Sequence, residues 1–255
     1  MKKTIRITIF GLLLLISFSM SAQVKKLISE INSVGTKETI TFKYNNKNQL
    51  IYFDEKGIVT YREFTLKYDK VSGQLTECIV NEDKGELILN SKYDYSNHNY
   101  IREEIKTSGK KIQNKTTDYN KIYIDGKNRL AKTVFSDEKL WEEFKYDEND
   151  NIITYTIHAA SGNSNTSTTY KFNTKNGVFL NINNLPLWLL ALHLNNMKWT
   201  EGITGKNTPV EFTGDDPIYG TETTEVSYVY DEDGYPVRQY YDGKLVREFS
   251  YKQIK

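Results

Sequence analysis

The chain is poor in the residues that define several common kinds of protein. It has one cysteine among 255 residues, so no internal disulfide can form. Its four prolines all follow residue 185. Proline has no N–H to donate to a neighbouring strand and is rare inside sheets. The long stretch before the first proline is therefore free to form uninterrupted β-ladders.

Sequence signatures of catalysis are missing as well. The chain has no His-Glu-x-x-His motif of metal hydrolases, no Gly-x-Ser-x-Gly nucleophile elbow and no phosphate-binding loop. The three histidines, His98, His158 and His193, are scattered. Fragments of calcium loops begin at Asp147 and Asp231, but neither continues to the distal glutamate of an EF-hand, so we interpret both as turns. The sequence therefore predicts no metal site and no cofactor.

Two adjacent pairs of acidic residues invite comparison with the carboxylates of glycosidases. Neighbouring residues on a strand point to opposite faces of the sheet. Neither pair can therefore flank one glycosidic bond by itself. The pairs are Glu103-Glu104 and Glu142-Glu143. We predict a protein that is not an enzyme.

The longest apolar run of the chain lies at the N-terminus. Lys2, Lys3 and Arg6 precede apolar residues 7–18, and small residues follow, as in an export signal. Twelve residues fall short of the roughly 20 that a membrane-spanning helix needs. We predict a signal peptide over residues 1–22, cleaved after Ala22 or one residue earlier, and a single mature domain over residues 23–255. With no cysteine near the cleavage point, we expect a periplasmic or extracellular protein that is not a lipoprotein.

An excess of either charge is also lacking. Removal of the signal leaves 31 basic and 33 acidic residues, a net charge of −2. A chain without a basic excess has little electrostatic attraction to nucleic acid or to anionic lipid. We therefore expect neither as a partner, and no membrane-spanning segment after the signal is removed.

A short pattern, aromatic-x-tyrosine-aspartate followed by a polar turn, recurs along most of the chain. Its third positions lie 24, 25, 31, 22, 26 and 58 residues apart, about the length of two strands and two turns. The acid or amide that follows closes the strand by accepting bonds from its own turn backbone. The third positions are Tyr44, Tyr68, Tyr93, Ile124, Tyr146, Phe172 and Tyr230.

Clusters of Asn, Asp, Gly and Lys divide the rest into stretches rich in Tyr, Ile, Val, Thr and Phe, which predicts about fifteen strands. Apolar and polar residues alternate within them, as around Phe144 and Tyr155, so one face of each strand is buried and the other is wet. We predict a mainly β fold: an antiparallel up-and-down meander, strongly curved or barrel-like. Cys78 lies in one such strand, and we expect it to be buried as a small apolar residue.

Two segments depart from the strand pattern. Residues 24–34 carry apolar side chains at helical spacing, which predicts a short N-terminal helix. Residues 184–199 are apolar on all sides and begin with Asn184 and Pro186, a capping residue and a first-turn residue. Because a helix that is apolar all round must be buried, we expect this one to plug or pack against the concave face of the sheet.

Together these motifs resemble an exported family of unknown function from Bacteroidetes, described as having a porin-like fold. The resemblance rests on the tyrosine-aspartate hairpins, residues 185–190, the turn at 206–209 and the closing segment 228–236. The hairpins are also similar to the YD repeats of large secreted toxins. The family implies no activity, and it usually carries a lipoprotein cysteine, which is absent here. A membrane-spanning porin is disfavoured because residues 101–115 carry too many charges to face lipid.

These features favour an exported binding or scaffold module that presents a broad sheet to a protein or a glycan. The alternative is a carrier that holds a small hydrophobic ligand in the concavity beside the helix of residues 185–199. The helix decides between them, because a helix that fills the concavity leaves no room for a ligand. The candidate ligand-binding residues are Trp141, Trp188, His193, Trp199 and Tyr219.

Overall fold

The fold is an antiparallel β-meander. The computed structural model describes residues 24–110, 112, 115–159, 165–182, 189 and 205–254. Within these residues the chain forms sixteen strands, close to the prediction of about fifteen. The strands are β1 (Lys25–Ser33), β2 (Glu38–Tyr44), β3 (Leu50–Lys56), β4 (Tyr61–Tyr68), β5 (Leu75–Glu82), β6 (Leu87–Asp94), β7 (Ile101–Ser108), β8 (Thr116–Ile124), β9 (Leu130–Val134), β10 (Leu140–Tyr146), β11 (Ile152–Ala159), β12 (Thr166–Asn176), β13 (Asn207–Asp216), β14 (Gly220–Tyr230), β15 (Pro236–Tyr241) and β16 (Lys244–Ile254).

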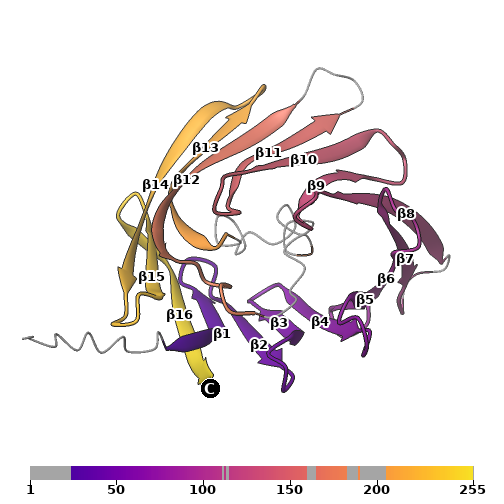
Figure 1. Ribbon diagram of the computed structural model, residues 1–255, viewed down its shortest axis with the longest axis horizontal. Coiled ribbons are helices and arrows are strands. Elements are labelled where there is room, and N and C mark those ends of the chain that lie inside the picture. Colours follow the sequence, from indigo (N-terminus) through magenta and orange to yellow (C-terminus); the bar gives the residue numbers. More distant parts are fainter. Residues whose placement is uncertain are drawn as a thin grey trace, which may run out of the picture.

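The meander closes into a barrel. Each strand pairs with the strands before and after it in the sequence, and β1 pairs with β16 from Lys25 opposite Ile254 to Ser33 opposite Arg247. Figure 1 shows the strands following one another around a ring. Closure removes the two free edges that an open meander would expose. Across the residues that the structure describes, no helix is long and apolar enough to cross a membrane.

The turns form as the sequence predicts. In all seven copies of the repeat, the side-chain oxygen of the closing residue accepts the backbone N–H two residues later, at 2.8–3.1 Å. In several turns the fourth residue adopts the left-handed conformation, as Asn48, Asn128 and Gly234 do. A bulge follows in the adjoining ladder, as in hairpins that combine a type I turn with a left-handed residue. The seven closing residues are Asn45, Asp69, Asp94, Asp125, Asp147, Asn173 and Asp231.

The tyrosines beside these turns have a structural task that the sequence did not suggest. At this end of the barrel, four strand pairs lose their backbone pairing before the strands end. In each, a tyrosine hydroxyl on or just after one strand donates to a backbone carbonyl of the neighbouring strand, outside the paired region. Four such bonds, of 2.7–2.8 Å, join Tyr44 to Ile28, Tyr68 to Leu50, Tyr95 to Leu75 and Tyr146 to Leu130. We call them the tyrosine bridges. At the repeat position Ile124 the chain has no tyrosine to form such a bridge. There the backbone pairing of β7 and β8 continues as far as Ile101 opposite Ile122.

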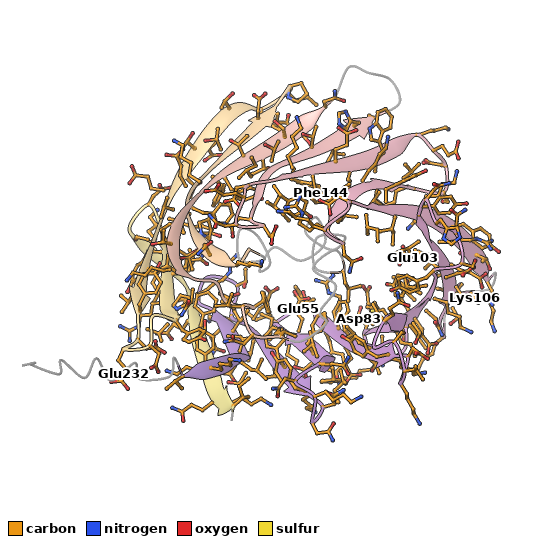
Figure 2. All side chains as sticks on the ribbon, viewed as in Figure 1. Glu55, Asp83, Glu103, Lys106, Phe144 and Glu232 are labelled. Atoms are coloured by element: carbon orange, nitrogen blue, oxygen red, sulfur yellow. The ribbon has the colours of Figure 1, made fainter. Side chains whose placement is uncertain are left out.

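The two faces of the wall differ as the alternation predicts. Phe144 and Tyr155 are directly opposite on β10 and β11, their rings stack at 5.0 Å, and both are buried. Figure 2 shows Phe144 and Glu103 on the inner side of the ring and Lys106 on the outer side. Cys78 is buried as expected, and burial raises the pKa of its thiol to about 12, which keeps it in the unreactive protonated form.

The predicted N-terminal helix over residues 24–34 is wrong, because this segment is strand β1. The ladder between β1 and β16 has a bulge between Ile28 and Glu30, which shifts the alternation by one residue. Ile28 and Ile31 therefore both face the core and are fully buried. Their spacing of three residues, which suggested a helix, results from the bulge.

The predicted helix over residues 184–199 lies outside the described residues, apart from Leu189. The described parts of the long connection between β12 and β13 do enter the core. Val178, Phe179 and Leu189 are buried there, and Phe179 packs edge-on against Phe42 with ring centroids 5.8 Å apart. The two ends of this connection come close together at Gly177 and Gly205. A Cβ atom at position 177 would lie 2.3 Å from the Gly205 carbonyl oxygen, so the approach requires glycine.

The tyrosine bridges predict a loss of stability when one hydroxyl is removed. We expect Tyr68→Phe to lower the free energy of unfolding by about 1–3 kcal/mol, because the Leu50 carbonyl loses its hydroxyl donor. Urea denaturation measures the change. Tyr219→Phe is the control, because Tyr219 is 89% exposed. Equal stability of both variants would show that the bridge contributes nothing.

The buried position of Leu189 predicts that the connection between β12 and β13 supports the barrel. We expect Leu189→Ala to cost about 2–5 kcal/mol through the cavity it leaves. Leu180→Ala in the same connection is the matched control, because Leu180 is 38% exposed. Thermal melting of the two variants compares them, and similar midpoints would show that the connection does not stabilise the core.

Candidate functional site

The structure places two of the five residues predicted to bind a ligand. Trp188, His193 and Trp199 lie outside the described residues. Tyr219 lies in the turn between β13 and β14 beside Ile218, and the two are 89% and 79% exposed. Trp141 lies on β10, within the barrel wall. The two described candidates therefore belong to different parts of the molecule.

Trp141 belongs to a row of residues that crosses five strands. The register sets Arg102 opposite Lys121, Lys121 opposite Val134, Val134 opposite Trp141, and Trp141 opposite His158. The row thus runs from β7 to β11 at right angles to the strands. On the first four strands of the row, one sequence neighbour of each residue points the other way and is buried, as a two-sided strand requires. These buried neighbours are Glu103, Asn120, Thr133 and Glu142. The row is therefore on the outer face of the barrel.

One end of the row is a stacked aromatic pair. The rings of Trp141 and His158 lie 5.0 Å apart and are inclined by only 10°. The Lys132 ammonium is 5.2 Å from the centre of the Trp141 ring. Glu143 contacts the His158 Nε2 at 3.2 Å. These contacts hold the two rings face to face on the outside of the sheet.

The other end carries tyrosines. The Arg102 guanidinium lies 4.1 Å from the centre of the Tyr119 ring, and Tyr119 is 42% exposed. Tyr100 and Tyr123 lie beside them, with ring centres 5.7 Å apart. We call the rings of Tyr100, Tyr119, Tyr123, Trp141 and His158 the outer aromatic face.

Only part of this face was predictable from the sequence. Trp141 is a candidate because an exposed aromatic ring can stack on a sugar, but the sequence leaves its orientation open. Alternation places His158 on the wet face with Thr154 and Thr156, without a role in binding. Its alignment with Trp141 depends on the hairpin register.

The paired acids are separated by the barrel wall, as the sequence predicts. Glu103 and Glu142 are 4% and 1% exposed on the inside. Asn120 donates to Glu103 at 2.8 Å, and the Tyr155 hydroxyl donates to Glu142 at 2.6 Å. Glu104 lies outside and pairs with Lys106 at 2.9 Å. Neither adjacent pair therefore offers two carboxylates to one bond.

Burial raises the pKa of the Glu103 carboxyl, and hydrogen bonds from Asn120, Ser91 and Tyr93 oppose this effect in part. The charged form is disfavoured because it would lie in the interior without a cation among these neighbours. The ion pair with Lys106 lowers the pKa of Glu104 on the outer side. The wall thus sets two adjacent glutamates in opposite electrostatic environments.

The two calcium-like turns hold side-chain cations. Lys26 reaches Asp231 and Asp233 at 2.8 and 2.5 Å, and so ties β1 to the turn between β14 and β15. Arg129 and Lys206 contact Asp150 at 2.8 and 2.5 Å. Among the side chains that the structure describes, no three histidine, cysteine or acidic residues gather where a metal could sit. These turns therefore bind the barrel's own hairpins together.

Comparisons with known proteins give a likeness of fold. No protein-family model matches the sequence, and no curated protein matches it. A porin-like protein from Bacteroides uniformis ATCC 8492 aligns with a TM-score of 0.49 and 13% identity over 89% of this chain and 96% of that one. A porin-like protein from Bacteroides vulgatus ATCC 8482 gives 0.43 and 13% over 89% and 99%. At this level no residue role carries over.

Glu103 predicts a dependence of stability on pH. In the unfolded chain its carboxyl ionises above about pH 4.3, whereas the fold favours the neutral form, so stability falls as pH rises beyond that value. We expect Glu103→Gln to remove this loss, because an amide keeps the contact with Asn120 without a charge to bury. Its melting midpoint should exceed that of the parent at neutral pH and equal it near pH 4.

Glu104→Gln is the matched control for this experiment. Its carboxylate is outside and its pKa is lowered by Lys106, so the amide gains nothing at neutral pH. Differential scanning calorimetry between pH 4 and 8 compares the variants. A Glu103→Gln midpoint below that of the parent across this range would show that the buried carboxylate is stabilising when charged.

Proposed function

We propose that the protein is an exported, non-enzymatic binding module that holds a carbohydrate partner on its outer aromatic face. The observation that carries the proposal is the alignment of Arg102, Lys121, Trp141 and His158 in one row across five strands. An aromatic ring offers a flat apolar surface, and polar groups at its edges fix the orientation of a ligand. A rigid sheet holds both kinds of group at fixed spacing.

The outer wall supports a protein that works in water. Lys67 and Glu77 are direct partners on β4 and β5 and form an ion pair at 2.6 Å. Similar direct pairs join β12 to β13 and β15 to β16. A charge facing lipid at mid-membrane costs about 2–4 kcal/mol. These pairs favour a periplasmic or extracellular module over one embedded in a bilayer.

Aromatic side chains pack inside the barrel beside β2, β3 and β4. Barrels of 16–18 strands leave an aqueous channel when nothing fills them. Here Phe53 stacks on Phe64 at 4.1 Å and on Phe42 at 6.0 Å, and Phe179 packs against Phe42 from the connection between β12 and β13. This part of the interior is thus occupied by the protein's own side chains, and these contacts do not favour the hydrophobic-ligand carrier.

The chemistry of the face favours a glycan over a protein partner. The cores of protein interfaces are depleted of lysine. Lys121 and Lys132 lie among the rings, at the middle of this face. A ligand rich in hydroxyl groups can bond to such charges and stack on the rings at the same time.

The proposal predicts that Trp141 is needed for binding. We expect Trp141→Ala to weaken binding of oligosaccharides by about tenfold or more, because truncating an anchoring tryptophan typically costs over 1 kcal/mol. An array of neutral and acidic oligosaccharides finds the ligand, and calorimetry measures the affinity.

Tyr219→Ala is the control, because Tyr219 is an exposed aromatic residue of the turn between β13 and β14. Its affinity should equal that of the parent. Loss of binding in Tyr219→Ala but not in Trp141→Ala would move the site to that turn. Absence of any bound oligosaccharide, with a protein partner retained through Trp141, would replace the glycan by a protein.

A further inference from the structure

We propose that the ligand of the outer aromatic face is an anionic oligosaccharide, bearing carboxylate or sulfate groups, that lies across the strands along the row from Arg102 to His158. This inference rests on the proposed function, because it uses the same face. It adds the charge of the ligand, its direction on the sheet and its length.

The row itself sets the direction and the length. Its residues are consecutive cross-strand partners on β7 to β11. Neighbouring strands are about 4.8 Å apart, so four spacings between five strands span roughly 19 Å. A hexose unit in an extended chain is about as long as one such spacing. The row therefore matches an extended chain of roughly four sugars.

The charged side chains along the row indicate the sign of the ligand's charge. Between β7 and β11 the row contains Arg102, Lys121 and His158, and it contains no carboxylate. The carboxylates of the face lie beside the row, and each contacts a basic side chain. Glu104 pairs with Lys106 at 2.9 Å, Glu138 in the turn after β9 pairs with Lys121 of the row at 2.8 Å, and Glu143 contacts His158 of the row at 3.2 Å. The two cations that lie over rings of the face, Arg102 and Lys132, therefore carry the argument for an anionic ligand.

The same arrangement disfavours a ligand that runs along a strand. On β7, Glu104 is two residues from Arg102 and faces the same side. On β10, Glu143 is two residues from Trp141 and also faces outward. A chain parallel to either strand would carry its acidic groups directly over a glutamate. The row itself contains Arg102, Lys121, Val134, Trp141 and His158, and none of these is a carboxylate.

The cations are held in positions from which they can turn to a ligand. Arg102 lies over the Tyr119 ring at 4.1 Å, and Lys132 lies near the Trp141 ring at 5.2 Å. Cation–π contacts at exposed sites are weak, so a sugar can displace either cation from its ring at small cost. The displaced group stays within reach of an acidic substituent on that sugar, and a guanidinium binds carboxylate or sulfate with two parallel bonds.

The test compares one sugar chain with and without its charges. Isothermal titration calorimetry measures binding of tetragalacturonate and of its neutral methyl ester, and a sulfated heparin-derived tetrasaccharide serves as a second acidic probe. We expect one of the acidic probes to bind at least tenfold more tightly than the neutral ester. Affinity for that probe should fall as salt rises, and its disaccharide should bind at least tenfold more weakly.

The variants separate charge from stacking. We expect Arg102→Gln and Lys132→Gln each to weaken binding of the acidic probe about fivefold or more, and to leave binding of the neutral ester unchanged. Trp141→Ala should weaken both. Lys67→Gln on β4 is the matched control, because Lys67 is also an outward lysine but lies outside the face. Its affinity should equal that of the parent.

Three outcomes would overturn the inference in different ways. Equal binding of acidic and neutral chains, with loss in Trp141→Ala, would show that the face binds glycans without selecting charge, so the proposed function would stand. Absence of binding by every tetrasaccharide to the folded parent protein would remove the proposed function together with the inference. Equal affinity for disaccharide and tetrasaccharide would exclude a ligand that extends along the row.

Discussion

The rest of the structure depends on one hydrogen bond, which the closing aspartate or asparagine of each repeat makes with the backbone at the end of an even-numbered strand, from β2 to β14. An aspartate or asparagine side chain captures the backbone N–H two residues ahead and so fixes the turn, as Asp69 and Asp147 do. The turn sets the register of the hairpin, and the register decides which side chains face inward. A slip of one residue would turn Phe144 outward and Trp141 inward, because strand side chains alternate. The buried apolar side of the wall and the outer aromatic face are therefore both consequences of local turn chemistry.

The local parts of this architecture were predictable from the sequence, and the non-local parts were not. Turn residues and alternation predicted the meander and the burial of Cys78, because both signals lie within a few residues of one another. The β1 bulge was missed, since a one-residue insertion makes Ile28 and Ile31 imitate a helix. The tyrosine bridges were also missed, because each joins residues 16–20 positions apart and depends on where a ladder stops.

The candidate site shows the same division. Trp141 was recognisable by its residue type. Arg102, Tyr119 and His158 can be assigned to the same site only when the register of five strands is known. No short motif marks them, because neighbours in the row lie on different strands and are separated in sequence by a turn and parts of two strands. The opposite holds for the acids: alternation alone was enough to predict that Glu103 and Glu104 would lie on opposite sides of the wall.

The pairing of β1 with β16 has a consequence for how the protein folds. Each hairpin joins residues close in sequence and can form early, whereas the closing ladder joins Lys25 to Ile254 across the whole chain. Its loop-closure entropy is the largest of any ladder in the barrel. Until that ladder forms, both terminal strands present unpaired backbone to the solvent, and a second copy of the chain offers the same strand partners. The final step of folding is thus a competition between closing one ring and linking two molecules, and protein concentration decides its outcome.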